Sequence, residues 1–439
     1  MHRLENTGRL AAIGILAGCA LTLATRTVAA GTPPKLTPVE ALGKALFFDT
    51  NLSTPAGQSC ASCHEPAAGF TGPSSFINAH GAVMEGAVAG LFGKRKPPSA
   101  AYATYSPDFG FDRRRRLFVG GQFWDGRAAN TAEQAKEPFL NPVEMANRDA
   151  GTVCLAVKAA EYAPLFEAVY GPGSLDCDEG LELTYQLIAD AIAAYEASEE
   201  VNPFSSKYDR YLDGLVYLTP EEAAGLEVFN APDKANCAAC HPSDPGPGGR
   251  KPLFTDFTYD NIGVPKNPEN PFYAMPRSIN PLGPAWVDLG LGVTVELDDE
   301  LGKQKVPTLR NVDKRPSPAF VKAYMHNGAL KSLEEVVHFY NTRDVESWPS
   351  PEYGENVNDE ELGDLGLSPD EESALVAFLR TLSDGFEVMP GDLDGSGAID
   401  GRDLGLLLGG WGGAGPADLD GDGVVGTADL AILVGAWTG

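Results

Sequence analysis

The amino-acid sequence predicts a mainly α-helical protein with long loops, built from two similar domains and a small C-terminal module. Three observations support this fold class. A helix-start pattern occurs twice, and an acidic pattern repeats after Pro390. The apolar/polar alternation of strands is rare, while 50 Gly and 34 Pro indicate long, fixed loops.

The first 30 residues have the pattern of a secretory signal peptide. Arg3 and Arg9 precede or border the apolar run 10–18, and residues 28–30 (Val-Ala-Ala) offer small side chains for cleavage. The segment ending at Cys19 (Leu-Ala-Gly-Cys) resembles the lipobox of bacterial lipoproteins, so acylation of Cys19 is the alternative. No later segment has the roughly 18 apolar residues of a membrane helix. We therefore expect an exported, periplasmic protein.

The repeated helix start indicates a duplicated domain. Residues 36–47 and 218–229 match in register at Leu, Thr, Pro, Glu, Ala, Gly and Phe. Thr37 and Thr219 can cap a helix, the prolines that follow suit its first position, and Glu40 and Glu222 complete a capping box. Further helices are expected around 183–198, 333–340 and 369–382. The expected domains span 34–213 and 218–387.

Each repeat is followed by a cysteine–histidine motif: Cys60-Ala-Ser-Cys63-His64 and Cys237-Ala-Ala-Cys240-His241. Two thiols can form thioether bonds to the vinyl groups of a haem, and the adjacent imidazole can bind its iron. The sequence therefore predicts two covalent c-type haems, one in each domain of a cytochrome c-like pair. The structural alternative is zinc, but each motif would need two further ligands and no second cysteine pair is available.

Two cysteines remain outside the motifs and the signal segment. Cys154 and Cys177 can form a disulfide, which an exported protein would retain, or stay as separate buried thiols. The sequence leaves both alternatives open.

The tail, residues 391–439, repeats an acidic loop at a spacing of 26 residues, from Asp392 to Asp418. Gly397 and Gly423 occupy the turn position of an EF-hand-type loop, and hard carboxylate oxygens suit calcium. The predicted ligands of the two loops are Asp392, Asp394, Ser396, Asp400 and Asp403, and Asp418, Asp420, Asp422 and Asp429. Asp at position 12, with a Leu-rich segment after each loop, resembles the type I dockerin module, which implies a protein partner for the tail. The alternative is a plain Gly-Asp linker.

The charge balance constrains the partners. The chain has 33 basic and 61 acidic residues, a net charge of −28. This charge argues against a nucleic-acid partner and allows steering of a basic partner, such as a small basic electron carrier. The alternative is that the charge serves solubility and reflects the carboxylates of the tail.

Four segments, in order, carry a resemblance to the bacterial di-haem cytochrome c peroxidases and their MauG-type relatives over residues 36–382. They are Phe123-Trp-Asp-Gly-Arg127, the segment from Gln134 through Asn141-Pro-Val to Glu144-Met145, Val306-Pro-Thr-Leu-Arg-Asn311, and Tyr324-Met-His-Asn-Gly328. The resemblance implies a peroxide reaction at the first haem, with electrons delivered through the second.

The resemblance also implies roles for three residues. Glu144 matches the acid–base residue that moves the peroxide proton, and Gln134 the hydrogen-bond donor that orients peroxide. Trp124 matches the tryptophan that relays an electron hole between the haems. The structural alternatives are a solvated carboxylate for Glu144, a capping box with Thr131 for Gln134, and a core side chain for Trp124.

Two distal iron ligands follow from the same resemblance. His80 stands where relatives place a removable ligand of the first haem; the alternative is a free surface histidine. Relatives place a methionine ligand of the second haem fourteen residues after the histidine of the Tyr-x-His-x-Gly segment, and counting from His326 gives Tyr340. Tyr340 shares the apolar face of its expected helix, whereas His338 points the other way and Met325 lies in a loop. The alternative is a core tyrosine with its hydroxyl bonded elsewhere.

The leading interpretation is thus a peroxidase that reduces hydrogen peroxide to water, with electrons from a small cytochrome c or cupredoxin. A phenolate stabilises ferric iron more than a thioether does, a departure that matches the MauG-type branch. One alternative is therefore a MauG-type oxidase, which uses high-valent haem iron to oxidise a protein or organic substrate. Another is a non-catalytic electron carrier.

Overall fold

The computed structural model describes residues 35–439. The predicted signal peptide, with its alternative at Cys19, lies outside these residues. Within the described part, no helix is long and apolar enough to cross a membrane.

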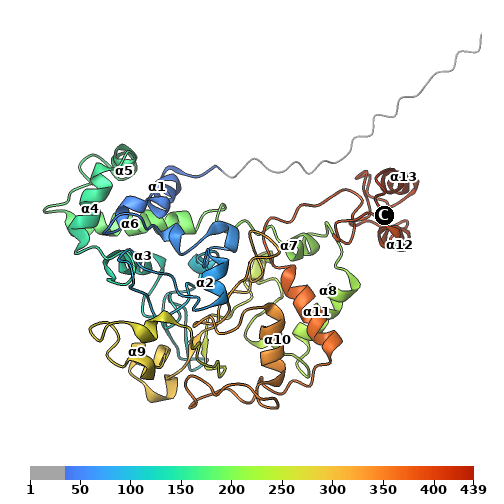
Figure 1. Cartoon of the computed structure of the whole chain (residues 1–439). Coiled ribbons are helices and arrows are strands. Elements are labelled where there is room, and N and C mark those ends of the chain that lie inside the picture. Colours follow the sequence, from blue (N-terminus) through green and yellow to red (C-terminus); the bar gives the residue numbers. More distant parts are fainter. Residues whose placement is uncertain (1–34) are drawn as a thin grey trace, which may run out of the picture.

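The predicted mainly α architecture is confirmed (Figure 1). The helices are α1 (Pro38–Phe48), α2 (Ser75–Ala79), α3 (Thr131–Leu140), α4 (Ala150–Ala159), α5 (Ala163–Tyr170), α6 (Leu181–Glu196), α7 (Lys207–Leu212), α8 (Pro220–Asn230), α9 (Leu291–Val295), α10 (Leu333–Thr342), α11 (Pro369–Arg380), α12 (Gly401–Gly409) and α13 (Thr427–Gly435). Two short antiparallel pairs join β1 (Gly110–Asp112) to β2 (Leu117–Val119) and β3 (Tyr259–Asp260) to β4 (Gln304–Lys305). Long loops connect these elements.

The duplicated helix start folds identically in both copies. Helices α1 and α8 each begin with a complete capping box, formed by Thr37 with Glu40 and by Thr219 with Glu222. The repeated glycine also has a packing role. A Cβ on Gly43 would lie 1.8 Å from the carbonyl oxygen of Ala191 in α6, and one on Gly225 would lie 1.9 Å from that of Ala374 in α11. Only glycine therefore allows each helix to cross its partner this closely.

Three separate hydrophobic clusters form the core. The buried members of the first lie between Leu42 and Val201, those of the second between Tyr208 and Leu382, and those of the third between Leu393 and Leu433. The third cluster belongs to the tail, whose helices α12 and α13 lie together at one end of the molecule (Figure 1). Tyr217, which follows α7, packs against this cluster and donates its backbone N–H to Leu393.

Cys154 in α4 and Cys177 form a disulfide, with their Cα atoms 5.6 Å apart. This selects one of the two alternatives that the sequence left open. The other four cysteines of the described chain, all in the two motifs, remain thiols.

Candidate haem sites and the residues between them

The first motif begins with a tight 3₁₀ turn over Cys60–Ser62. The backbone N–H of His64 donates to the carbonyl of Cys60 at 2.9 Å, which holds the imidazole next to the two thiols. The ring Nδ1 lies 3.1 Å from the carbonyl oxygen of Phe70. An Nδ1–H that donates to this carbonyl leaves Nε2 as the nitrogen that can bind iron.

The second motif repeats this geometry. Cys237–Ala239 form the turn, and the His241 N–H donates to the carbonyl of Cys237 at 2.9 Å. The Nδ1 atom of His241 lies 2.7 Å from the carbonyl oxygen of Phe254. Both imidazoles are thus oriented in the same way, by a backbone carbonyl six residues downstream of His64 and thirteen downstream of His241.

The first motif lines a cavity of about 510 Å³ that also brings together Gln134, Glu144 and Trp124. Glu144 follows α3 in a turn in which its N–H donates to the carbonyl of Asn141 at 3.0 Å. Its side chain is half-buried, and burial raises the pKa of its carboxyl group, against the opposing effect of the Arg127 charge. Glu144 therefore differs from the freely solvated carboxylate that was its structural alternative.

Gln134 lies in the second turn of α3 and lines the same cavity. The helix is capped by Asn130, whose side chain accepts the N–H of Glu133 at 3.1 Å, so the suggested capping box of Thr131 with Gln134 is wrong. The Thr131 hydroxyl instead accepts a hydrogen bond from Gln122 at 3.4 Å.

The second motif lines a largely apolar cavity that also contains Tyr340 and Met325. Tyr340 lies on α10, and burial raises the pKa of its hydroxyl. No hydrogen bond links this hydroxyl to another of residues 35–439, which argues against the alternative of a core tyrosine bonded elsewhere. His338 points away from the cavity, toward Glu372 and Glu346, as its position on the helix predicts.

Trp124 lies between the two cavities and lines both of them. Its side chain is 8% exposed, and its indole N–H donates to the carbonyl of Lys96 at 2.9 Å. The His326 ring meets it edge-on, with the ring centroids 6.4 Å apart. His326 in turn lies 3.3 Å from the buried carboxylate of Glu352. The indole is therefore fixed in place at the junction.

His80 does not reach the first cavity. It is exposed at the C-terminal end of α2, where its Nδ1 lies 2.8 Å from the carbonyl oxygen of Phe76 and its ring packs against the Phe76 ring. The structure thus brings together Glu144, Gln134, Trp124 and His64, but not His80.

Lys96, which is buried, and Lys305, which is half-buried, line the cavities without a carboxylate partner among the described residues. Lys96 donates to Thr71 and to the carbonyl of Pro97, both at 3.2 Å, and Lys305 donates to Ser106 at 2.7 Å. Burial lowers the pKa of Lys96 to about 8 and that of Lys305 to about 7. Sequence reasoning missed both residues, because a lysine in a basic segment is normally a solvated side chain.

These features fit haem. Each cavity combines two unpaired thiols and an oriented imidazole with a lysine that has no carboxylate partner and could pair with a haem propionate. Zinc fits less well, because within residues 35–439 no further Cys, His, Asp or Glu ligand atoms lie close enough to either motif to complete a shared metal site. In residues 35–439, the groups of three or more His, Cys, Asp or Glu side chains close enough to share a metal are two aspartate groups in the tail.

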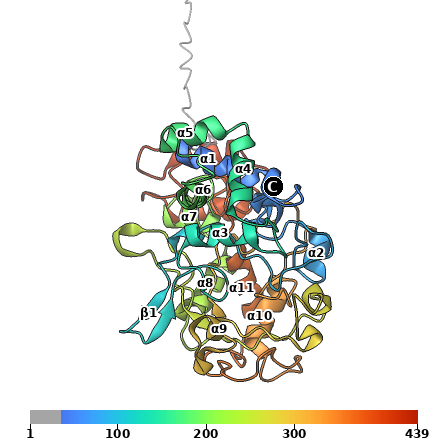
Figure 2. The same ribbon diagram turned by 90° about the vertical axis from the view of Figure 1, so that its left-hand side faces the viewer.

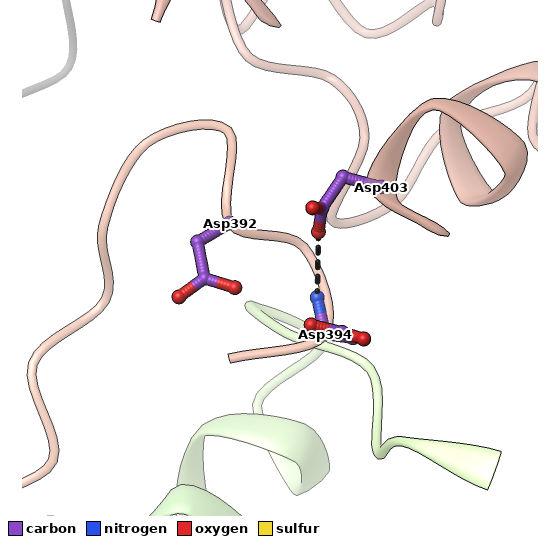
Figure 3. A group of neighbouring side chains, drawn as sticks. All are labelled: Asp392, Asp394 and Asp403. Carbon is purple, nitrogen blue, oxygen red and sulfur yellow. Dashed lines mark hydrogen bonds between the residues drawn. The ribbon is translucent and has the colours of Figure 1, made fainter. Parts of the chain in front are cut away.

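The first tail group joins Asp392, Asp394 and Asp403, all buried (Figure 3). Asp403 accepts the N–H groups of Leu393 at 2.7 Å and Asp394 at 3.3 Å. One carboxylate oxygen of Asp394, Oδ2, is buried without a partner. Asp400, a predicted ligand, caps α12.

The second tail group joins Asp418, Asp420 and Asp422, and it is more exposed. Asp429, predicted as a further ligand, lies outside this group and accepts the N–H groups of Leu419 at 2.7 Å and Gly426 at 2.7 Å.

Comparison with known proteins identifies the family. Methylamine utilization protein MauG of Paracoccus denitrificans (strain Pd 1222) is 39% identical over 386 residues, which cover 83% of this chain and 95% of that protein. The chain belongs to the di-haem cytochrome c peroxidase and MauG family. A family model described as di-haem cytochrome c peroxidase matches residues 38–216. Cytochrome-c peroxidase IdrP2 of Denitromonas iodatirespirans is 30% identical, over 86% of this chain and 93% of that protein.

The crystal structure of the diheme peroxidase BthA from Burkholderia thailandensis E264 has the same fold, with a TM-score of 0.68 and 35% sequence identity over 81% of this chain and 88% of that chain. This member of the di-haem peroxidase family is therefore an oxidoreductase. Membership implies two c-type haems, which Cys60, Cys63 and His64 and Cys237, Cys240 and His241 would hold.

Proposed function

We propose that this protein reduces hydrogen peroxide to water with electrons from a small redox protein, passed through the haem at His241. The observation that carries the proposal is that Glu144 and Gln134 line the same cavity as His64. A bound haem would supply an iron that takes up peroxide and exchanges electrons with it. Proton transfer, orientation of the peroxide and electron transfer between the sites would depend on the protein's own side chains.

Glu144 would take the proton from one peroxide oxygen and return it to the departing oxygen. Burial, which raises the pKa of this carboxyl group, brings it closer to the pH at which a group can both accept and donate a proton. The amide N–H of Gln134 would donate to peroxide and orient it. The indole of Trp124, which lines both cavities, would carry the electron hole from one site to the other.

Tyr340 would bind the second haem through its hydroxyl oxygen. Support comes from its place in the cavity of His241 and from the lack of any described hydrogen-bond partner for the hydroxyl. His80 would serve as the removable ligand of the first haem only if the 75–80 segment moves, because it is exposed in this structure.

Tyr340 also favours a second function, that of a MauG-type oxidase. A phenolate ligand stabilises the oxidised iron, which suits storage of oxidising power for a protein or organic substrate. The 39% identity to a MauG protein agrees with this. A third function, electron carriage without catalysis, would leave Glu144 without a role.

The tail would bind two calcium ions, one in each acidic loop, and present a dockerin-like surface to a protein partner. The unpartnered Oδ2 of Asp394 supports the first site, because a buried carboxylate oxygen needs a cation or a donor. We further propose export to the periplasm by the signal peptide, as a lipoprotein if Cys19 is acylated, and three domains at 34–213, 218–387 and 391–439.

The test is a steady-state assay of the haem-loaded full chain with hydrogen peroxide and a reduced cytochrome c, followed by analysis of oxidised amino acids. Peroxide-dependent oxidation of the cytochrome with water as the product supports the peroxidase. Absence of peroxide consumption with every donor would leave only the electron carrier. Oxidised side chains on an added protein, formed at the expense of peroxide, would indicate the MauG-type oxidase instead.

A further inference from the structure

A small β-hairpin carries a run of four consecutive arginines, Arg113–Arg116, in the turn between β1 and β2. All four are exposed, as are Phe111 at 50% and Leu117 at 38% at the ends of the turn. Figure 2 shows this hairpin at the edge of the molecule. A protein of net charge −28 thus presents a concentrated positive patch, which we call the arginine hairpin (residues 110–119).

The arginine hairpin is connected to the second haem site by direct contacts. Arg115 forms an ion pair with Asp256, whose backbone N–H donates to the carbonyl of Cys240 at 2.9 Å. At the base of the hairpin, Gly120 accepts a hydrogen bond from the hydroxyl of Tyr259 at 2.6 Å. Asp260, the next residue, lines the cavity of His241. The arginines therefore lie next to the second haem attachment.

This attachment loop is also the one that reaches the surface. Ala239, inside the second motif, and Pro242, directly after it, are exposed, whereas none of residues 60–66 around the first motif is exposed. A redox protein can therefore contact the second attachment loop beside the arginine hairpin.

We propose that the arginine hairpin is the docking surface for a small soluble redox protein with an acidic surface patch, which exchanges electrons with the haem at His241. The inference rests on the proposed peroxidase function. Each encounter passes one electron, so two reduced donors and two protons convert one hydrogen peroxide into two water molecules. Guanidinium groups pair well with carboxylates, and the exposed Phe111 ring, which packs on Phe118 on one face of the hairpin, gives the apolar contact that such transient interfaces contain.

The charge of the arginine hairpin, rather than the net charge of the protein, determines which partner docks there, because salt screens charges that are far away. The Debye length is about 10 Å at 0.1 M ionic strength, so acidic residues far from the hairpin contribute little to the field there. Asp112 and Asp256 lie at the hairpin itself, and its four arginines outnumber them. The expectation of a basic donor, drawn from the net charge, is therefore replaced by an acidic one.

The experiment uses the haem-loaded full chain with Arg113, Arg114 and Arg116 all changed to Glu. Arg115 is kept, because it holds Asp256. The matched control changes three exposed cations elsewhere, Lys35, Lys158 and Arg402, to Glu, which alters the net charge equally. The probes are reduced plastocyanin, which has an acidic patch, and reduced mitochondrial-type cytochrome c, which is basic. Hydroquinone, a neutral donor, reports peroxide turnover without protein docking.

We expect kcat/KM for plastocyanin to fall about tenfold in the hairpin variant, and to fall with added salt in the parent, because steering depends on the local field. The control variant should change less, the basic cytochrome should react faster with the hairpin variant, and an Arg→Lys triple variant should keep the parent rate. Equal losses in hairpin and control variants would overturn the proposal. So would hairpin-dependent binding to phosphatidylglycerol vesicles with unchanged plastocyanin turnover. Failure with hydroquinone in the parent would instead contradict the peroxidase function itself.

Discussion

The two haem-binding halves share one framework and differ in the side chains that line their cavities. Each half has a capped helix that crosses its partner at a glycine, Gly43 or Gly225, and a histidine whose Nδ1 meets a backbone carbonyl. The first cavity adds Glu144, and the second adds Tyr340. The two halves therefore share the structure that would hold a haem. They differ in the segment after α3 and in helix α10, which give each cavity different side chains.

The largest expected effect is on the peroxide rate and comes from removing the Glu144 carboxyl group, which only the first cavity has. Glu144→Gln should leave both haems bound but lower kcat/KM for peroxide by roughly two to four orders of magnitude, because the proton transfer is lost. The matched control is Glu133→Gln on the exposed side of α3, which should keep the parent rate. Stopped-flow and steady-state kinetics measure both, and undiminished turnover of Glu144→Gln would refute its role.

The pH dependence of the peroxide rate also tests the role of Glu144. Glu144 must be ionised to accept a proton, and burial raises its pKa. The peroxide rate of the parent should therefore rise with pH through a pKa above the ordinary glutamate value of about 4.3. The rise should disappear in Glu144→Gln, and its persistence there would assign the titration to another group.

The next expected effect is on stability, and it tests the close helix crossing at a glycine that both halves share. Gly43→Ala and Gly225→Ala should each destabilise the protein by about 1–3 kcal/mol, because the added Cβ overlaps a carbonyl of the facing helix. Gly405→Ala in α12, where a Cβ meets no atom within 4 Å, should instead stabilise its helix by about 0.5–1 kcal/mol. Denaturant unfolding of the three variants measures the signs. A neutral result at Gly43 with a large one at Gly225 would show that the halves are not equivalent in packing.

A smaller, spectroscopic effect tests the second half. Tyr340→Phe should change the ferric absorption and electron paramagnetic resonance signals of one haem only, since it removes one iron ligand. His338→Gln, on the opposite side of α10, should change neither haem. Met325 lines the same cavity, so a methionine–iron charge-transfer band in the parent, or an unchanged spectrum of Tyr340→Phe, would contradict the assignment to tyrosine.

Sequence predicted the features that depend on fixed short spacing. The capping boxes of Thr37 and Thr219, the two turns that place His64 and His241, and the mainly helical fold all follow from residues that are close in the chain. The inward position of Tyr340 followed from helical periodicity in the same way.

Features set by distant contacts could not be predicted. Asn130 and Thr131 are both good helix caps, and Gln122, nine residues earlier, engages the Thr131 hydroxyl. The burial of Lys96 and the partial burial of Lys305 depend on how loops from both halves meet around Trp124, which no local sequence pattern predicts. The distance of His80 from the first cavity likewise depends on how α2 packs.

The smallest effect on peroxide turnover is expected from the tail, which holds a second duplication whose copies also differ. In its first loop the aspartates are buried and Asp394 has an unpartnered oxygen, whereas the second loop is exposed. A buried, preorganised set of carboxylates binds calcium more tightly than a solvated one, since fewer groups must be ordered on binding. Calorimetric titration of the full chain should therefore resolve two calcium sites of unequal affinity. Asp394→Asn should weaken the tighter site, and Asp422→Asn should weaken the other.

Chelation of calcium should loosen the tail but leave the haem spectra and peroxide turnover unchanged, because the tail core is separate from the two haem-bearing cores. No heat on calcium addition would end the calcium proposal, and loss of turnover on chelation would show that the tail supports the haem domains.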